Sequence, residues 1–423
     1  MAFAGLLWPD AAKAQNASSP PTPITIDALV AEALERNAEL GFYRAEIAAA
    51  RGQQQTSGGH TNPELSGAIG QKRVSLGPAI SDGLVWSVSV KQTFEWPGRI
   101  SLRKAIANQD VKLAELGLDQ FKTALASRAR TLAFTLFAAL ETAAAAREVA
   151  ERFQSLREVL VQRDPAGLTP VLETRIIEAT ELTLRRKATE AALAADSARL
   201  ELNQLRGQPW EQMLNVAAPN LAFPAFPGAE PLLAAARAGN FEIRMRQAEI
   251  EQQGFRVSLA RNEKKPTLTV SPYLAQENAV DRETQFGIGL SVPLPLWNRG
   301  DGKVATEEAR RLQAETSLHV AQRNLERQVV EKGFAYQTRL AEMARWRPES
   351  VEKFKQAAAL ADRHYRLGAV PIATYIELQK QYLEAVDALL STRREALEAA
   401  LELQRLTGVE LNHVAAAKAE AQK

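Results

Sequence analysis

The stretch "SVPLPLWNRGDG", Ser291 to Gly302, changes from one structural pattern to another within a few residues. Apolar side chains alternate up to Leu296, as they do in a β-strand. Trp297 follows, and then the turn-forming run Asn298-Arg299-Gly300. A helical pattern continues beyond it, and "SVKQTFEWPGRI", Ser89 to Ile100, makes the same change two hundred residues earlier. The chain therefore contains two junctions at which a strand is expected to run into a long helix.

Landmarks in the first half of the chain recur at a nearly constant distance in the second half. The offset is 203 or 201 residues for four pairs: Asn37 and Asn240, Pro63 and Pro266, Gly167 and Gly368, Gly207 and Gly408. Such regular self-similarity indicates a tandem duplication. We assign repeat 1 to 26–218, a Pro-rich join to 219–229, repeat 2 to 230–412 and a tail to 413–423.

Each repeat is predicted to contain a shorter helix, two strands and a long helical hairpin. In repeat 1 these are 26–57, strands of about 64–72 and 84–96, and a hairpin over 101–206. In repeat 2 they are a helix over 230–262, strands of about 266–276 and 284–296, and a hairpin over 302–407. The two helices of this hairpin cover 302–366 and 372–407. The fold class is α+β, mainly α.

The last long helix carries two neighbouring apolar seams. Steps of three and four residues connect Ile376, Gln379, Leu383, Val386 and Leu390, which is a heptad pattern. A second seam through Tyr375, Tyr382 and Leu389 lies one residue over. Two seams require a neighbour on each side, as in a ring of coiled-coil helices.

Composition narrows the possible functions. Lys and Arg total 52 against 50 Asp and Glu, so charge does not favour a nucleic-acid partner, and the chain has no cysteine. Residues 1–14 contain an apolar run and Ala12-Lys13-Ala14, which is typical of a signal peptide whose basic start is missing. A disordered N-terminal tail is the alternative, and 15–25 is expected to be a linker. No apolar window has transmembrane-helix length, so a membrane crossing would have to use strands.

Four strands per chain cannot close a membrane sheet. Unpaired backbone groups in lipid cost several kcal/mol each, so copies of the chain would have to complete the structure. Trp96 and Trp297 would then lie at the membrane interface, a depth that suits amphipathic rings. The alternative is that both cap a soluble core.

The junctions "FEWPGR" and "PLPLWNRGDG", the duplication and "YRLGAVPIATYIELQKQYLEA" resemble the TolC family of outer-membrane efflux proteins. The junction motifs are most similar to the CzcC-like branch, which serves heavy-metal exporters of the RND type. The resemblance implies a homotrimer in the outer membrane, with a twelve-stranded transmembrane β-barrel and a periplasmic α-barrel. It further implies contact with outer-membrane lipid, a periplasmic membrane-fusion adaptor and an inner-membrane RND pump.

The same resemblance assigns the hairpin turns to adaptor docking. These tips are Gly167, Leu168, Thr169 and Pro170 in the first hairpin and Gly368, Ala369, Val370 and Pro371 in the second, flanked by Tyr365 and Arg366. The alternative is that they are only turns. It also places the carboxylates of a pore gate in the helix after the turn. Glu377 occupies one such position, Thr374 occupies the other and departs from the family pattern, and Glu173 lies similarly after the first turn. The alternative for the carboxylates is a solvated helix face.

We expect no catalytic residues, no metal ligands and no cofactor, because the four histidines are scattered and no nucleophile–base pattern or phosphate loop is present. The interpretation is a passive export duct for heavy-metal cations such as Co, Zn or Cd. A multidrug or protein-secretion duct of the same fold is the first alternative, and a periplasmic coiled-coil adaptor the second.

Overall fold

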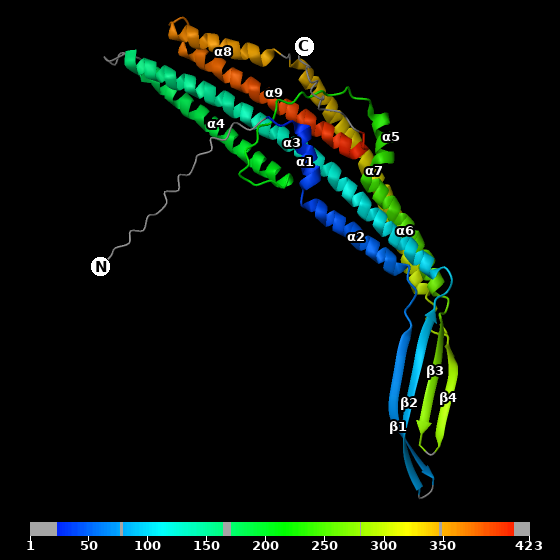
Figure 1. Ribbon diagram of the computed structural model, residues 1–423. Coiled ribbons are helices and arrows are strands. Elements are labelled where there is room, and N and C mark those ends of the chain that lie inside the picture. The colour runs from blue at the N-terminus through cyan, green and yellow to red at the C-terminus, as the bar shows by residue number, and fades with distance from the viewer. Residues whose placement is uncertain (1–22, 77–78, 164–170, 280, 347–348, 410–423) are drawn as a thin grey trace, which may run out of the picture.

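The computed structural model describes residues 23–76, 79–163, 171–279, 281–346 and 349–409. The chain is elongated, with a sheet at one end and long helices leading away from it (Figure 1). Among the described residues, no helix has the length and apolar character needed to cross a membrane.

Two helix pairs precede the two halves of the sheet. They are α1 (Ile26–Arg36) with α2 (Glu39–Ser57), and α5 (Ala229–Gly239) with α6 (Phe241–Glu263). A single helix was expected in each repeat. The chain instead breaks at Asn37 and at Asn240, whose backbones are extended (ψ 127° in both). Each Asn side chain accepts a hydrogen bond from an amide at the start of the next helix, so a cap replaces the helical continuation.

The sheet is antiparallel and follows chain order: β1 (Glu64–Leu76), β2 (Ala79–Phe94), β3 (Leu268–Asn278) and β4 (Arg282–Ser291). Strands β1 and β4 are its two edges. The register places Ile69 opposite Trp86, Val88 opposite Leu274, and Leu274 opposite Phe286. Directly opposed residues share a face, so most of the large apolar side chains of the four strands lie on one side of the sheet, with Val85 and Tyr273 among those on the other.

That side of the sheet is open to its surroundings. The most exposed large apolar side chains there belong to the two edge strands: Leu65, Ile69, Phe286, Ile288 and Leu290. The opposite face carries small and polar residues such as Ser87, Ser89 and Ser271, as the alternation predicted.

Strand β4 ends five residues before the predicted end at 296. Leu290 pairs with Val270, and β3 begins only two residues before Val270, at Leu268. Pro293 and Pro295 also lack the amide donors that a strand ladder needs. Residues 292–296 therefore continue past the start of the neighbouring strand.

The long helices are α3 (Arg99–Arg163), α4 (Val171–Leu205), α7 (Asp301–Arg345), α8 (Ser350–Arg366) and α9 (Ile372–Thr407). One helix was expected over 302–366. It is interrupted after Arg345, where Trp346 has an extended backbone (φ −78°, ψ 105°). The sequence places Pro348 just beyond, and proline cannot continue the hydrogen-bond ladder of a helix.

Helix α9 lies among several neighbours, packing against α3, α7 and α8 (Figure 1). Both predicted seams are largely buried: Tyr375 and Tyr382 in one, and Gln379, Leu383 and Val386 in the other. Two adjacent seams on α9 therefore do meet neighbours on two sides.

Candidate functional site at the tip of the helical hairpins

The second hairpin turns between α8 and α9 at Leu367–Pro371. Gly368 has a φ of +73°, and its amide donates to the Tyr365 carbonyl at 2.9 Å. The Ala369 amide donates to the His364 carbonyl, also at 2.9 Å. Left-handed glycine with these two bonds is a common helix C-terminus, and Pro371 then begins α9. The residues of the first tip, Gly167, Leu168, Thr169 and Pro170, lie outside the described part of the chain.

A chain of contacts connects the two hairpins next to this turn. The Tyr365 hydroxyl donates to a Glu173 carboxylate oxygen of α4 at 3.4 Å. The Tyr365 ring stacks on Tyr375 of α9, with centroids 5.3 Å apart and planes 16° apart. Tyr375 in turn lies 5.0 Å from the Phe153 ring of α3. The tip of α8 is therefore joined to α3, α4 and α9 through aromatic side chains.

Burial and neighbouring carboxylates raise the pKa values of the Tyr365 and Tyr375 hydroxyls. Desolvation raises the pKa of Tyr365 to about 12, with Glu173 adding to the effect. Burial also raises the pKa of the fully buried Tyr375, helped by the charge of Asp362. Arg366 donates to the same Asp362 at 2.9 Å. Both hydroxyls therefore stay protonated at physiological pH, and Tyr365 remains a donor to Glu173.

The three predicted gate residues lie in different surroundings. Glu173 is half-buried against Tyr365, whereas Thr374 and Glu377 are exposed on the first turns of α9. The Glu377 carboxylate accepts a bond from Gln381 of its own helix at 2.8 Å. The structure thus brings Glu173 together with Tyr365 of the predicted docking tip, and leaves Glu377 available on the surface of a single chain.

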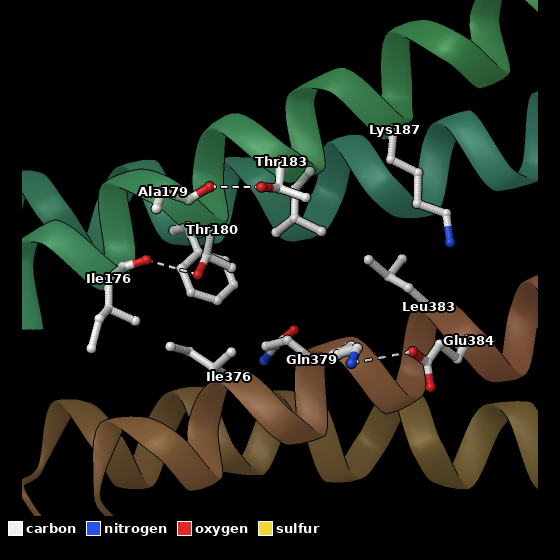
Figure 2. Close-up of a pocket in the computed structure, with 12 residues that line it drawn as sticks. Ile176, Ala179, Thr180, Thr183, Lys187, Ile376, Gln379, Leu383 and Glu384 are labelled. Atoms are coloured by element: carbon white, nitrogen blue, oxygen red, sulfur yellow. Dashed lines mark hydrogen bonds and ion pairs between the residues drawn. The ribbon is translucent and has the colours of Figure 1, made fainter.

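A groove that the sequence did not reveal lies between α4 and α9 (Figure 2). It has a volume of about 460 Å³. Its walls are mostly apolar, and Lys187 and Glu384 stand along it; the lining includes Phe153, Ile176, Leu184, Ile376, Gln379 and Leu383. The groove depends on how two hairpins align, which no local pattern in the sequence encodes.

Gln379, beside this groove, is a buried polar residue within an apolar seam. Its side chain is 1% exposed, donates to the Ala358 carbonyl of α8 at 2.6 Å and accepts from Arg152 of α3 at 3.4 Å. A satisfied polar group at a heptad core position can fix the register of neighbouring helices.

The two junction tryptophans differ strongly in exposure. Trp96 is 42% exposed, and the Lys265 ammonium lies 5.2 Å from its ring centroid. Trp297 is 95% exposed. In the ranges that the structure describes, no three His, Asp or Glu side chains are grouped closely enough to hold a metal ion.

Comparison with known proteins agrees with this architecture. Residues 232–409, most of the second repeat, match the family model of the outer membrane efflux proteins. The chain is 23% identical over 413 residues to the pyoverdine export outer membrane protein OpmQ of Pseudomonas aeruginosa, covering 90% of this chain and 85% of that protein.

Solved structures match over most of the length. CusC, described in terms of transmembrane channel formation, superimposes with a TM-score of 0.72 at 15% identity, covering 91% of this chain and 92% of that one. The outer membrane protein VceC of Vibrio cholerae gives a TM-score of 0.67 at 17% identity, covering 90% and 96%.

The chain thus has the fold of the TolC-like outer-membrane channels. The match of the second repeat and the relationship to OpmQ support the outer membrane efflux protein family more specifically. These comparisons do not confirm the CzcC-like branch.

Proposed function

We propose that this protein is the outer-membrane channel of a tripartite RND-type efflux system. The observation that carries the proposal is the channel fold, matched over nine tenths of the chain, together with a sheet that presents its apolar face outward. Apolar side chains facing lipid would stabilise the sheet in the outer membrane.

The proposed assembly is a homotrimer, the copy number that the resemblance to the TolC family implies. Association itself is supported by the two open edges of the sheet, β1 and β4. Each edge would pair with another copy, so that no unpaired backbone groups face lipid. Trp96 and Trp297 would then lie at the level of the membrane interface, and the hairpins would extend into the periplasm.

The proposed partner at the far end is a periplasmic membrane-fusion adaptor, itself attached to an inner-membrane RND pump. Docking would use the two tips: Gly167, Leu168, Thr169 and Pro170, and Tyr365, Arg366, Gly368, Ala369, Val370 and Pro371. The exposed Leu367, 74% accessible in the single chain, supports a contact surface at the second tip. The contact between Glu173 and Tyr365 would hold the two hairpins together until the adaptor engages them.

The proposed cargo is a heavy-metal cation such as Co, Zn or Cd, supported by the resemblance of the two strand-to-helix junctions to the CzcC-like branch. The alternative is a different cargo for a duct of the same fold, and the similarity to a pyoverdine export protein favours it. Either way, selection would lie in the pump rather than in the duct.

Growth of a deletion strain decides between these cargoes. The strain is tested with and without the restored gene on Co, Zn, Cd, Ni, Cu and Ag, and on dyes, antibiotics and iron-limited medium. Sensitivity to divalent metals alone would support metal export. Sensitivity to the organic compounds, or a growth defect confined to low iron, would preserve the duct and discard the metal cargo.

A further inference from the structure

The first strand-to-helix junction is covered by the segment that precedes β3. Phe94, the last residue of β2, pairs with Leu268, the first residue of β3. Just beyond this pair, the Asn262 side-chain amide donates to the Pro97 carbonyl at 3.0 Å. The buried Arg99 donates to the carbonyls of Asn262 (3.1 Å) and Lys265 (3.0 Å). Residues 262–265 thus form a seat for the junction at 96–99.

Within the part of the chain that the structure describes, no hydrogen bond joins Trp297, Asn298 or Arg299 of the second junction to another segment. Trp297 is 95% exposed where Trp96 is 42% exposed, and Asn298 and Arg299 are exposed as well. The duplication identifies the corresponding seat, because 262–265 lies 203 residues after 59–62. Those residues precede β1 and are also exposed. The junction and its seat lie at opposite edges of the sheet (Figure 1).

We propose that the second junction, residues 292–300, docks onto the segment 59–63 of another copy of this chain. Trp297 lies over that segment as Trp96 lies over 262–265. Arg299 follows Trp297 by two residues where Arg99 follows Trp96 by three, and its guanidinium supplies donors to the carbonyls of that segment from this neighbouring position. The inference rests on the proposed closure of the sheet by several copies, and adds which residues complete the contact.

Strand direction agrees with this pairing. The four strands alternate in direction, so β4 of one copy placed beside β1 of another continues the antiparallel order. Strand β1 starts at the end of the sheet where β4 finishes, because both lie at the helical side (Figure 1). Segment 59–63 of one copy then comes next to residues 292–300 of the other.

The same arrangement accounts for the apolar residues past the end of β4. Val292, Leu294 and Leu296 are 45%, 70% and 64% exposed and keep the alternation of Phe286, Ile288 and Leu290. Their neighbour β3 begins too late to cover them. A second copy's β1 edge and the segment before it would lie alongside them.

Because the chain has no cysteine, disulfide trapping tests the contact cleanly. The double variant Asn62→Cys with Asn298→Cys is oxidised in cell envelopes and run on a denaturing, non-reducing gel. We expect covalent dimers and larger products that vanish on reduction. Arg299→Cys in place of Asn298→Cys guards against an effect of losing the Asn298 bond to the Gly300 amide.

The control at the first junction is Pro97→Cys with Asn262→Cys, two residues in contact within one chain, which should crosslink within that chain and give no larger species. Each single-cysteine variant should remain monomeric on the gel. If the oligomer forms in the membrane but neither double variant gives covalent dimers, the docking inference is overturned and the proposed channel stands. If no oligomer forms in the membrane at all, the proposed function fails with it.

Discussion

Asn37 and Asn240 make the same contact in the two repeats. Each lies between two short helices, is buried, and donates its side-chain amide at 3.0 Å to the carbonyl of a leucine near the end of a long helix. The acceptors are Leu205 at the end of α4 and Leu406 near the end of α9. This bond joins the helix pair at the start of each repeat to the last turn of the second helix of its own hairpin.

Replacing either asparagine by alanine should therefore destabilise the protein. The variant loses the cap of the following helix and leaves a buried leucine carbonyl without its donor, at a cost of about 1–3 kcal/mol. Thermal unfolding of Asn37→Ala and Asn240→Ala, followed by circular dichroism in detergent, measures the effect. The exposed Asn62→Ala is the control, and equal melting of all three variants would contradict this role.

The repeats differ at the neighbouring ion pair. Arg206, 1% exposed, donates through Nε to the Glu32 carboxylate at 2.7 Å. Alanine and threonine, Ala235 and Thr407, occupy the corresponding positions of repeat 2. Glu32→Ala leaves the Arg206 charge buried without its partner, so we expect the free energy of unfolding to fall by about 2–4 kcal/mol. The lower end of this range is expected because the Glu32 side chain is 32% exposed.

The double variant Glu32→Ala with Arg206→Thr copies repeat 2 into repeat 1. It should be less destabilised than the sum of the two single variants, as measured by a double-mutant cycle in urea. Strict additivity would show that the two side chains do not interact energetically.

Replacing glycine by alanine should have opposite effects on stability at Gly207 and Gly52. Gly207 ends α4 with a φ of +63°, and a Cβ there would lie 2.8 Å from the Arg36 carbonyl oxygen. Gly207→Ala should destabilise by more than about 1 kcal/mol. Gly52, inside α2, has open space around it, so Gly52→Ala should stabilise by about 0.5–1 kcal/mol. Melting temperatures that shift in the same direction would contradict the account.

The contact between Tyr365 and Glu173 at the tip should be lost at alkaline pH. The folded-state pKa of Tyr365, about 12, lies above the ordinary value of about 10. Its contribution to stability is therefore complete below pH 10 and is lost as the pH rises from 10 to 12. Absorbance at 295 nm, compared between the native protein and Tyr365→Phe, should show that the missing group titrates near 12. Titration near 10 would show that Tyr365 is not held against Glu173 and its buried neighbours.

Glu377 should influence the charge preference of the pore if it forms a ring in the proposed trimer. Glu377→Gln removes one carboxylate per copy, so the preference for cations should fall. Reversal potentials in planar bilayers under a salt gradient measure it, with Glu384→Gln in the α4–α9 groove as the control. An unchanged reversal potential for Glu377→Gln would place Glu377 on a solvated face outside the pore.

Much of the architecture could be predicted from periodicity and self-similarity. The duplication revealed Asn37 and Asn240 as corresponding positions, and the alternation of strands such as β2 gave the apolar face. The helix breaks at both asparagines were missed, because a cap side chain there competes with an otherwise continuous helical pattern.

The candidate site was harder to predict. Tyr365 and Glu173 were both singled out, but for different roles, and their contact joins residues 192 positions apart. It depends on the alignment of two hairpins, as does the α4–α9 groove. Gln379 gave a local signal, since a polar residue interrupts an apolar heptad seam, although its partners in α3 and α8 could not be named.

The location and the oligomeric state of the native protein give the most direct test of the proposed outer-membrane channel. Cell envelopes are separated on a sucrose gradient, and the outer-membrane fraction is run on a denaturing gel with and without heating. We predict that the chain is in the outer membrane and migrates, before heating, as an oligomer about three times the mass of the 46.3 kDa chain. A soluble 46.3 kDa monomer in the periplasm would contradict the proposal of an efflux channel.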